Sequence, residues 1–145
     1  MREVKFKAYW HESKLMTSVD TIEFLEGGTR VSDGCMHTGW AGKDCELIEY
    51  TGLKDKNGIE IYDGNIDQAE NGDKSVIVFL TKAGTYCVMP MDIYLNNDYQ
   101  NEAFLPDFIY GFGYDLFFDN CTPEKYLNII GNIYENPKLL EETEC

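Results

Sequence analysis

Long apolar segments are missing from this 145-residue chain. No run approaches the roughly 20 residues that a membrane-spanning helix requires. The first six residues also lack the apolar core of a secretory signal peptide. We therefore expect a protein that stays in the cytoplasm in which it is made. A chain of this length is long enough for one domain with a real core, or for a small domain with an N-terminal extension.

Basic residues are scarce. The chain has 12 Lys and Arg against 26 Asp and Glu, a formal net charge of −14, and no Lys or Arg occurs over residues 83–124. Nucleic-acid affinity comes largely from basic side chains that neutralise phosphates, so we expect no direct binding to DNA or RNA. The uneven distribution predicts a strongly negative surface that attracts a basic partner.

Recognisable catalytic and metal-binding motifs are absent as well. The glycines form neither a phosphate-binding loop nor a dinucleotide fingerprint. Only His11 and His37 can serve as histidine bases, and neither has a recognisable catalytic context. A zinc site that uses Cys35, His37 and Cys45 is conceivable, but its spacing matches no common zinc module. A catalytic Cys–His pair has no recognisable sequence context either. We therefore predict no enzymatic activity, no cofactor and no bound metal.

Cysteine spacing argues against a disulfide framework. The number of cysteines is odd and no two of them are separated by only two residues. This pattern favours free thiols in a reducing compartment. The cysteines are Cys35, Cys45, Cys87, Cys121 and Cys145.

The residues that are present favour a folded protein rich in β-strands. Apolar residues make up 43% of the chain and aromatic residues 14%, which argues against disorder. Residues 4–10 alternate apolar and polar side chains, which predicts a half-buried strand followed by a turn at 11–14. A return strand over 15–25 is expected to break near 18–21. Residues 29–43 carry several glycines and predict a surface loop, with Trp40 folded back onto the core.

Two hairpins are predicted further along the chain. Asn57 and Gly58 suit a tight turn between strands at 47–50 and 59–62. A second turn at 81–84 joins strands at 76–80 and 85–89, and Pro90 ends the pairing. Residues 92–119 mix acids with aromatics and predict irregular structure with a strand near 108–114. A helical turn at 122–125, a strand at 127–134 and a terminal helix at 136–142 complete the prediction.

Three motifs are spread over the chain. They are Arg-Glu-Val-Lys-Phe-Lys-Ala-Tyr-Trp at residues 2–10, Tyr-Thr-Gly-Leu-Lys-Asp-Lys-Asn-Gly-Ile-Glu-Ile-Tyr-Asp-Gly-Asn-Ile at 50–66 and Ile-Gly-Asn-Ile-Tyr-Glu-Asn-Pro-Lys-Leu-Leu at 130–140. Their order and spacing resemble the YopX family, small proteins of bacteriophages and prophages. The resemblance implies a mainly β fold with a small SH3-like barrel in the C-terminal part, an N-terminal strand module and short helices. We accordingly predict an N-terminal hairpin and loop extension at 1–46 and a barrel domain with a terminal helix at 47–145.

The central motif is best explained as structural. Its apolar side chains, such as Ile61 and Tyr62, offer surface to the barrel, whereas Asp55 and Lys56 are expected to face solvent. The chain differs from the family pattern at Asp67, where an apolar strand residue is usual. We expect this acid to shorten the strand.

The acidic and aromatic segment downstream of the second hairpin is the candidate interface. In one interpretation its phenylalanines fill a core while its acids remain solvated. In the other, aromatic residues form the centre of an interface and the acids speed encounter with a basic protein. The residues predicted to bind the partner are Asp92, Asp98, Glu102, Asp107, Tyr110, Tyr114, Asp115 and Asp119.

Three functions remain open on these grounds. The leading hypothesis is a non-enzymatic phage or prophage accessory protein that docks on a basic host or phage protein, for example a counter-defence protein that blocks a nucleic-acid-binding surface. The alternative is an oligomeric binder of a small molecule or nucleotide, with Trp40, Tyr110 and Tyr114 stacking on a base or sugar ring. The third is a structural phage protein that assembles with copies of itself.

Overall fold

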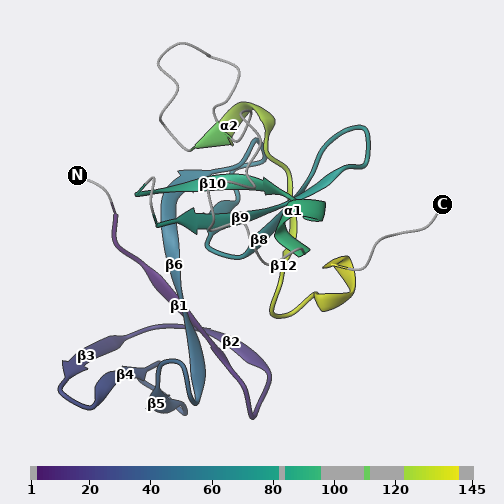
Figure 1. Cartoon of the computed structure of the whole chain (residues 1–145). Coiled ribbons are helices and arrows are strands. Elements are labelled where there is room, and N and C mark those ends of the chain that lie inside the picture. Colours follow the sequence, from purple (N-terminus) through teal and green to yellow (C-terminus); the bar gives the residue numbers. More distant parts are fainter. Residues whose placement is uncertain (1–2, 82–83, 96–109, 112–122, 141–145) are drawn as a thin grey trace. The chain divides into compact units, whose positions relative to one another are not determined.

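The protein divides into two compact units, Met1–Tyr50 and Thr51–Cys145. The computed structural model describes residues 3–81, 84–95, 110–111 and 123–140 (Figure 1). The predicted domain boundary between residues 46 and 47 falls inside strand β6 (Cys45–Lys54), which begins in the first unit and ends in the second. Antiparallel strands dominate the described residues, and the predicted mainly β fold is confirmed.

The first unit contains two groups of strands. Strand β1 (Phe6–Trp10) pairs antiparallel with β2 (Leu15–Ser18) on one side and with β6 on the other. Strands β3 (Thr21–Leu25), β4 (Gly28–Ser32) and β5 (Thr38–Trp40) form a separate three-stranded sheet. The predicted break in the return strand is therefore confirmed, because β2 and β3 belong to different sheets. The core of this unit is a cluster of Ala8, Trp10, Val31 and Cys45.

Strands β4 and β5 replace the surface loop predicted over residues 29–43, and that prediction was wrong. Val31 is fully buried between polar neighbours, which is the period of a strand, but the pattern is too short to stand out. Gly39 was misleading because it serves close packing within the sheet. A Cβ on Gly39 would lie 2.7 Å from Cβ of Asp44.

The second unit contains a five-stranded antiparallel sheet that curls into a half-barrel. The strand order is β11-β10-β9-β8-β12, and β7 is hydrogen-bonded to β6. The predicted SH3-like barrel in the C-terminal part is confirmed in the form of this curled half-barrel. The strands are β7 (Glu60–Tyr62), β8 (Asn65–Gln68), β9 (Lys74–Leu80), β10 (Thr85–Pro90), β11 (Tyr110–Gly111) and β12 (Ile129–Asn132).

Short helices complete the second unit. They are α1 (Met91–Leu95), α2 (Pro123–Tyr126) and the 3-10 helix η3 (Pro137–Leu140). Helix α2 has proline at its first position, as the sequence predicted. The described part of the predicted terminal helix is a single 3-10 turn. Strand β11 falls within the predicted strand near 108–114, and most of the acidic and aromatic segment lies outside the described residues.

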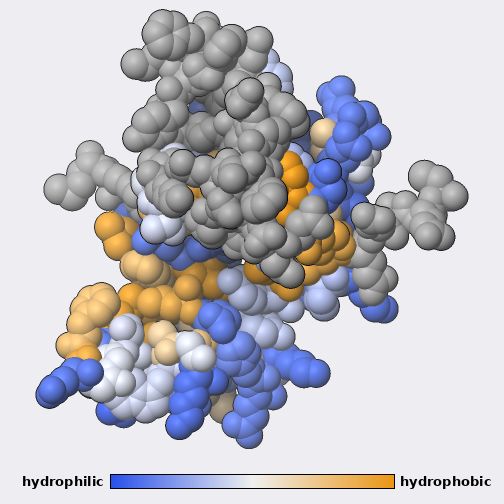
Figure 2. Space-filling view, viewed as in Figure 1, coloured by the Kyte–Doolittle hydropathy of each residue, from blue (hydrophilic) through white to orange (hydrophobic). Residues whose placement is uncertain are grey.

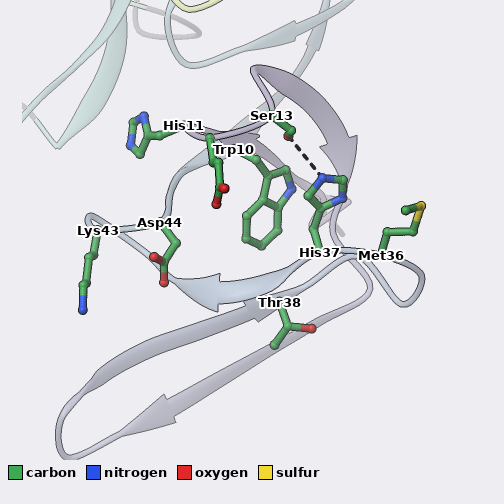
Figure 3. Close-up of a pocket in the computed structure, with 9 residues that line it drawn as sticks. Trp10, His11, Ser13, Met36, His37, Thr38, Lys43 and Asp44 are labelled. Atoms are coloured by element: carbon green, nitrogen blue, oxygen red, sulfur yellow. Dashed lines mark hydrogen bonds between the residues drawn. The ribbon is translucent and has the colours of Figure 1, made fainter.

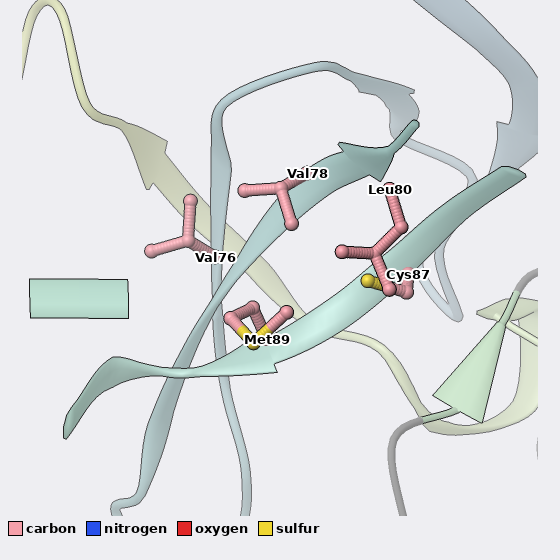
Figure 4. Close-up of a cluster of buried hydrophobic side chains, with 5 residues drawn as sticks. All are labelled: Val76, Val78, Leu80, Cys87 and Met89. Atoms are coloured by element: carbon pink, nitrogen blue, oxygen red, sulfur yellow. The ribbon is translucent and has the colours of Figure 1, made fainter. Parts of the chain in front are cut away.

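Strand β9 has buried apolar residues on both faces, which accounts for most of its continuous apolar sequence, although Phe79 is 40% exposed. Val76, Val78 and Leu80 pack on one face with Cys87 and Met89 of β10 (Figure 4). On the other face, Ile77 packs in a second cluster with Ile61 of β7, Tyr86 of β10 and Leu127, which precedes β12. The predicted hairpin is confirmed, with Leu80 paired to Thr85 across the turn.

Asp55 does not face solvent, and that prediction was wrong. Its residue exposure is 3%. One carboxylate oxygen accepts the N–H groups of Asn57 and Ile59, at 2.8 and 2.9 Å, and the other accepts the N–H of Ile129 at 2.9 Å. The carboxylate therefore satisfies the amides of the Asn-Gly turn and joins that turn to the start of β12. The sequence around the turn predicts a solvated Asp55, because the residue whose N–H donates to its second oxygen, Ile129, lies 74 residues away.

Asp67 is also buried, with 5% exposure, and lies inside β8. Burial raises the pKa of this carboxyl group, while a hydrogen bond from the Asn128 N–H at 2.7 Å opposes the rise. Strand β8 continues past Asp67 to Gln68, so the acid does not end the strand. Asp67 pairs with Ile129 of β12, and its side chain accepts the N–H of Asn128, just before that strand.

Candidate functional site

Most residues predicted to bind a partner lie outside the described part of the chain. Of the others, Asp92 is exposed in α1, and Tyr110 belongs to β11, where it pairs with Val88 of β10. Trp40, predicted to stack on a ligand, is half-buried in β5 and packs against Gly28. The residues outside the described ranges are Asp98, Glu102, Asp107, Tyr114, Asp115 and Asp119.

A pocket of about 580 Å³ lies in the first unit (Figure 3). Its volume falls within the range of small-molecule sites. The end of β1 contributes Trp10, the turn at residues 11–14 contributes Ser13, and the segment before β5 contributes His37. Lys43 and Asp44, from the turn that precedes β6, line it as well. Three separate parts of the chain thus supply polar side chains to one open cavity.

Ser13, His37 and Asp33 form a hydrogen-bonded chain at this pocket. The Ser13 hydroxyl oxygen lies 3.2 Å from Nε2 of His37, and Nδ1 of His37 lies 2.8 Å from a carboxylate oxygen of Asp33. A carboxylate can only accept a hydrogen bond, so Nδ1 carries the proton when the ring is neutral. Nε2 is then the acceptor for the Ser13 hydroxyl.

Asp33 is held rigidly behind the histidine. Its side chain is 7% exposed, and one of its oxygens accepts the N–H groups of His37 and Cys35, both at 2.9 Å. The hydrogen bond from the His37 amide does most to lower the pKa of Asp33, to about 2, and burial opposes it. The Asp33 N–H also donates to the His37 carbonyl at 3.0 Å. These bonds close the loop into a fixed turn.

The Trp10 ring packs against one face of the His37 imidazole. The two rings stack with centroids 5.1 Å apart and planes 28° from parallel. Trp10 is itself 4% exposed, and its indole N–H donates to the Thr17 hydroxyl at 2.8 Å. His37 is therefore held at both ring nitrogens and against one face.

The lowered pKa of Asp33 predicts that the first unit loses stability in acid. The folded-state pKa of about 2 lies below the ordinary value of 3.8, so the ionised carboxylate stabilises the fold at higher pH. That contribution should be complete above about pH 5 and should disappear as the pH falls from about 4 to about 2. Both tryptophans, Trp10 and Trp40, belong to this unit, so their fluorescence reports its unfolding.

The measurement is denaturant unfolding of the wild type and Asp33→Asn at intervals from pH 6 to pH 2. We expect the wild type to be more stable above pH 5, with a difference that narrows steadily toward pH 2. Asp20→Asn, at an exposed position, controls for the change in charge. A difference that does not change with pH would contradict the assignment.

Sequence reasoning missed this site. Ser13 was placed in a turn and Asp33 in a loop, and 24 residues separate Ser13 from His37. The only local signal is that Asp33 precedes Cys35 by two residues and His37 by four, a spacing at which an Asp side chain can bond to following amides. That signal predicts a turn and carries no information about a serine from another strand pair.

The conceivable zinc site has no support in the described part of the chain. No group of three or more His, Cys, Asp and Glu residues lies close enough to hold a metal there. Cys45 is buried, and burial raises its pKa to about 11, helped by the charges of Asp44 and Glu46. Cys35 is exposed, and Cys35, Cys45 and Cys87 are free thiols.

The end of the β3–β4 hairpin presents apolar surface to solvent. Phe24 is 83% exposed and Leu25 46% exposed. Figure 2 shows apolar residues at this end of the hairpin beside hydrophilic ones. Two side chains cover less area than the contiguous patch of several hundred Å² that marks an interface, so this feature assigns no partner.

Among the described residues, no helix is both long and apolar enough to cross a membrane.

Comparisons with known proteins place the chain in a family. A search of curated proteins found no match. The crystal structure of protein EF1440 from Enterococcus faecalis has the same fold, with a TM-score of 0.50 and 22% identity over 97% of this chain and 100% of that chain. The family described as YopX protein matches residues 5–141, and neither comparison indicates an enzymatic family. Because this match spans nearly the whole chain, the protein belongs to the YopX family.

Proposed function

We propose that the protein is a phage or prophage accessory protein that acts by binding in the cytoplasm of a bacterial host. Its acidic second unit docks on a basic protein and blocks the surface with which that partner binds nucleic acid, as a counter-defence protein would. The second unit acts without chemistry of its own. The phage origin is supported by membership of the YopX family, whose proteins come from bacteriophages and prophages.

The observation that carries the proposal is the separation of charge between the two units. Residues 1–50 contain nine acidic and six basic side chains, a net charge of −3. Residues 51–145 contain seventeen acidic and six basic side chains, a net charge of −11. A field concentrated on one unit speeds the approach of a basic partner and repels nucleic acid.

Salt dependence tests the proposal. Full-length protein is used to capture partners from infected host cells, and the affinity of each purified partner is measured between 50 and 500 mM salt. We expect the affinity to fall by about tenfold or more across this range, because ionic strength screens the attraction. A partner whose affinity is indifferent to salt, or the absence of any basic partner, would contradict the proposal.

Matched charge variants locate the interface. Neutralising three acids of the second unit, Asp92→Asn, Asp98→Asn and Glu102→Gln, should weaken the complex and flatten its salt dependence. The control neutralises three exposed acids of the first unit, with the same change in net charge, and should bind like the wild type. The control substitutions are Asp20→Asn, Glu23→Gln and Glu26→Gln.

The pocket of the first unit supports a second candidate, a binder of a small molecule. Its volume suits such a ligand. Glu12 and Asp44 line it against a single Lys43, a balance that disfavours a nucleotide phosphate. Thermal unfolding in the presence of nucleotides and of uncharged metabolites separates this candidate from the first, because only a small-molecule binder is stabilised without a protein partner.

A further inference from the structure

We propose that Ser13, activated by His37, is a nucleophile that takes up the acyl group of a small uncharged ester. The site belongs to the first unit alone. This reaction is separate from the partner binding proposed for the second unit, and each proposal is tested without the other.

The first support is the geometry of three groups in series. An activated nucleophile needs a base within hydrogen-bond reach and a third group that orients the base. The Ser13–His37 and His37–Asp33 separations, 3.2 and 2.8 Å, meet both requirements. The two ring nitrogens are used for different purposes, which is the arrangement that serine hydrolases share across unrelated folds.

The second support is that the base is pre-organised. Asp33 acts as a positioning residue, because it fixes the tautomer of His37 and is itself anchored by two backbone amides. The Trp10 ring limits rotation of the imidazole. A base held in one orientation contributes more to proton transfer than a freely rotating one.

The third support is the turn that carries the nucleophile. The Lys14 N–H donates to the Trp10 carbonyl at 2.8 Å, and the His11 N–H donates to the Asp44 carbonyl at 3.0 Å. Within the described part of the chain, the amides of Glu12 and Ser13 donate no hydrogen bond. Amides of a nucleophile's own turn are the usual donors to a developing oxyanion. Lys14, with φ of 59°, is the single described non-glycine residue with positive φ, so strain is stored beside Ser13.

The charges around the pocket define the substrate class. The carboxylates of Glu12 and Asp44 line it, with Asp33 behind the histidine, whereas Lys43 is the one cation among its lining residues. Lys43 lies on the other side of Trp10 from Ser13 in the view of Figure 3. An anionic ester would be repelled at the reacting end. A small ester without charge meets no such penalty, and the cavity has room for it.

The acylation step balances without any external reagent. The Ser13 oxygen attacks the ester carbonyl carbon, and its proton moves to Nε2 of His37. The carbon–oxygen bond to the leaving alcohol then breaks, and His37 returns the proton to that alcohol. In the second step water attacks the acyl-serine, again with His37 as the base, and releases the carboxylic acid and the free hydroxyl.

Acylation by p-nitrophenyl acetate tests the proposal. The full chain carries Cys35→Ala in every sample, because this exposed thiol would react with the ester by itself. We expect release of p-nitrophenol together with an acetyl group on Ser13, located by peptide mass spectrometry. Ser13→Ala should lose the adduct, and His37→Ala should form it about 10²- to 10⁴-fold more slowly. Added imidazole should partly restore acylation in His37→Ala, which a merely structural role of His37 would not allow.

Controls separate this result from other causes. Ser18→Ala, at an exposed serine of β2, should acylate like the parent protein. Tryptophan fluorescence verifies that each variant keeps the first unit folded. Absence of an adduct on Ser13, an adduct that forms equally fast without His37, or faster acylation by an anionic ester would overturn the proposal. Partner binding measured with Ser13→Ala should be unchanged, so a failure here leaves the acidic interface untouched.

Discussion

Replacing Asp55 by alanine is expected to lower the free energy of unfolding of the second unit by about 3–5 kcal/mol, because three backbone N–H groups lose a charged acceptor at once. Two of these amides belong to the Asn-Gly turn, and the third is that of Ile129 at the start of β12. The Asp55 N–H also donates to the Ile59 carbonyl, and the Asp55 carbonyl accepts the N–H of Gly58, so both the backbone and the side chain of Asp55 hold the turn. The substitution should loosen the turn and β12 together.

Urea unfolding followed by far-UV circular dichroism measures this effect, since both tryptophans belong to the first unit and do not report on the second. Asp55→Asn should show an intermediate loss, because its amide oxygen still accepts a hydrogen bond while its NH₂ group faces one of the donors. Asp73→Ala, at an exposed turn, is the matched control and should cost under about 1 kcal/mol. A loss for Asp55→Ala no larger than for Asp73→Ala would refute the structural role assigned to Asp55.

Replacing Gly64 by alanine is expected to cost about 2–4 kcal/mol, for two separable reasons. Its φ of 86° is a left-handed conformation that a side chain disfavours. A Cβ there would also lie 2.9 Å from the Tyr134 ring and 3.3 Å from Ile133. The Gly64 N–H donates to the Ile77 carbonyl and its carbonyl accepts from Ile133, so the backbone cannot move away without losing contacts to β9 and to the end of β12.

Gly58→Ala separates the two reasons. Its φ of 81° is nearly the same, but nothing lies within 4 Å of the added Cβ. This variant should therefore cost only the conformational term, about 1–2 kcal/mol. The excess of Gly64→Ala over Gly58→Ala in urea unfolding measures the steric term. Equal losses for the two variants would show that the Tyr134 contact yields freely.

Local patterns were sufficient for two strand pairs that close over a short turn. The Asn57–Gly58 turn and the hairpin of β9 and β10 were both predicted because their partners are adjacent in sequence. Strands β4 (Gly28–Ser32) and β5 (Thr38–Trp40) were missed because Gly39 is explained by its contact with Asp44, which no local pattern encodes. Turn preferences depend on neighbouring residues, whereas the contacts that require a glycine within a sheet depend on how the chain packs.

The candidate site was even less accessible to sequence reasoning. Ser13 follows β1 and His37 precedes β5, and no spacing rule relates them. They meet because the cluster around Trp10 packs the two strand groups of the first unit together. The prediction of a binding protein without enzymatic chemistry rested on missing motifs, and a motif describes only chemistry whose residues are close in sequence.

The sequence by itself determined the strand-rich character of the protein, its principal hairpins and the concentration of negative charge downstream of residue 50, because alternation, turn residues and charge are properties of neighbouring positions. Only the tertiary structure decided that Asp55 is a buried acceptor and that Ser13 reaches His37. Burial and hydrogen bonding depend on groups that folding brings from distant parts of the chain, and their energies appear only when those groups meet.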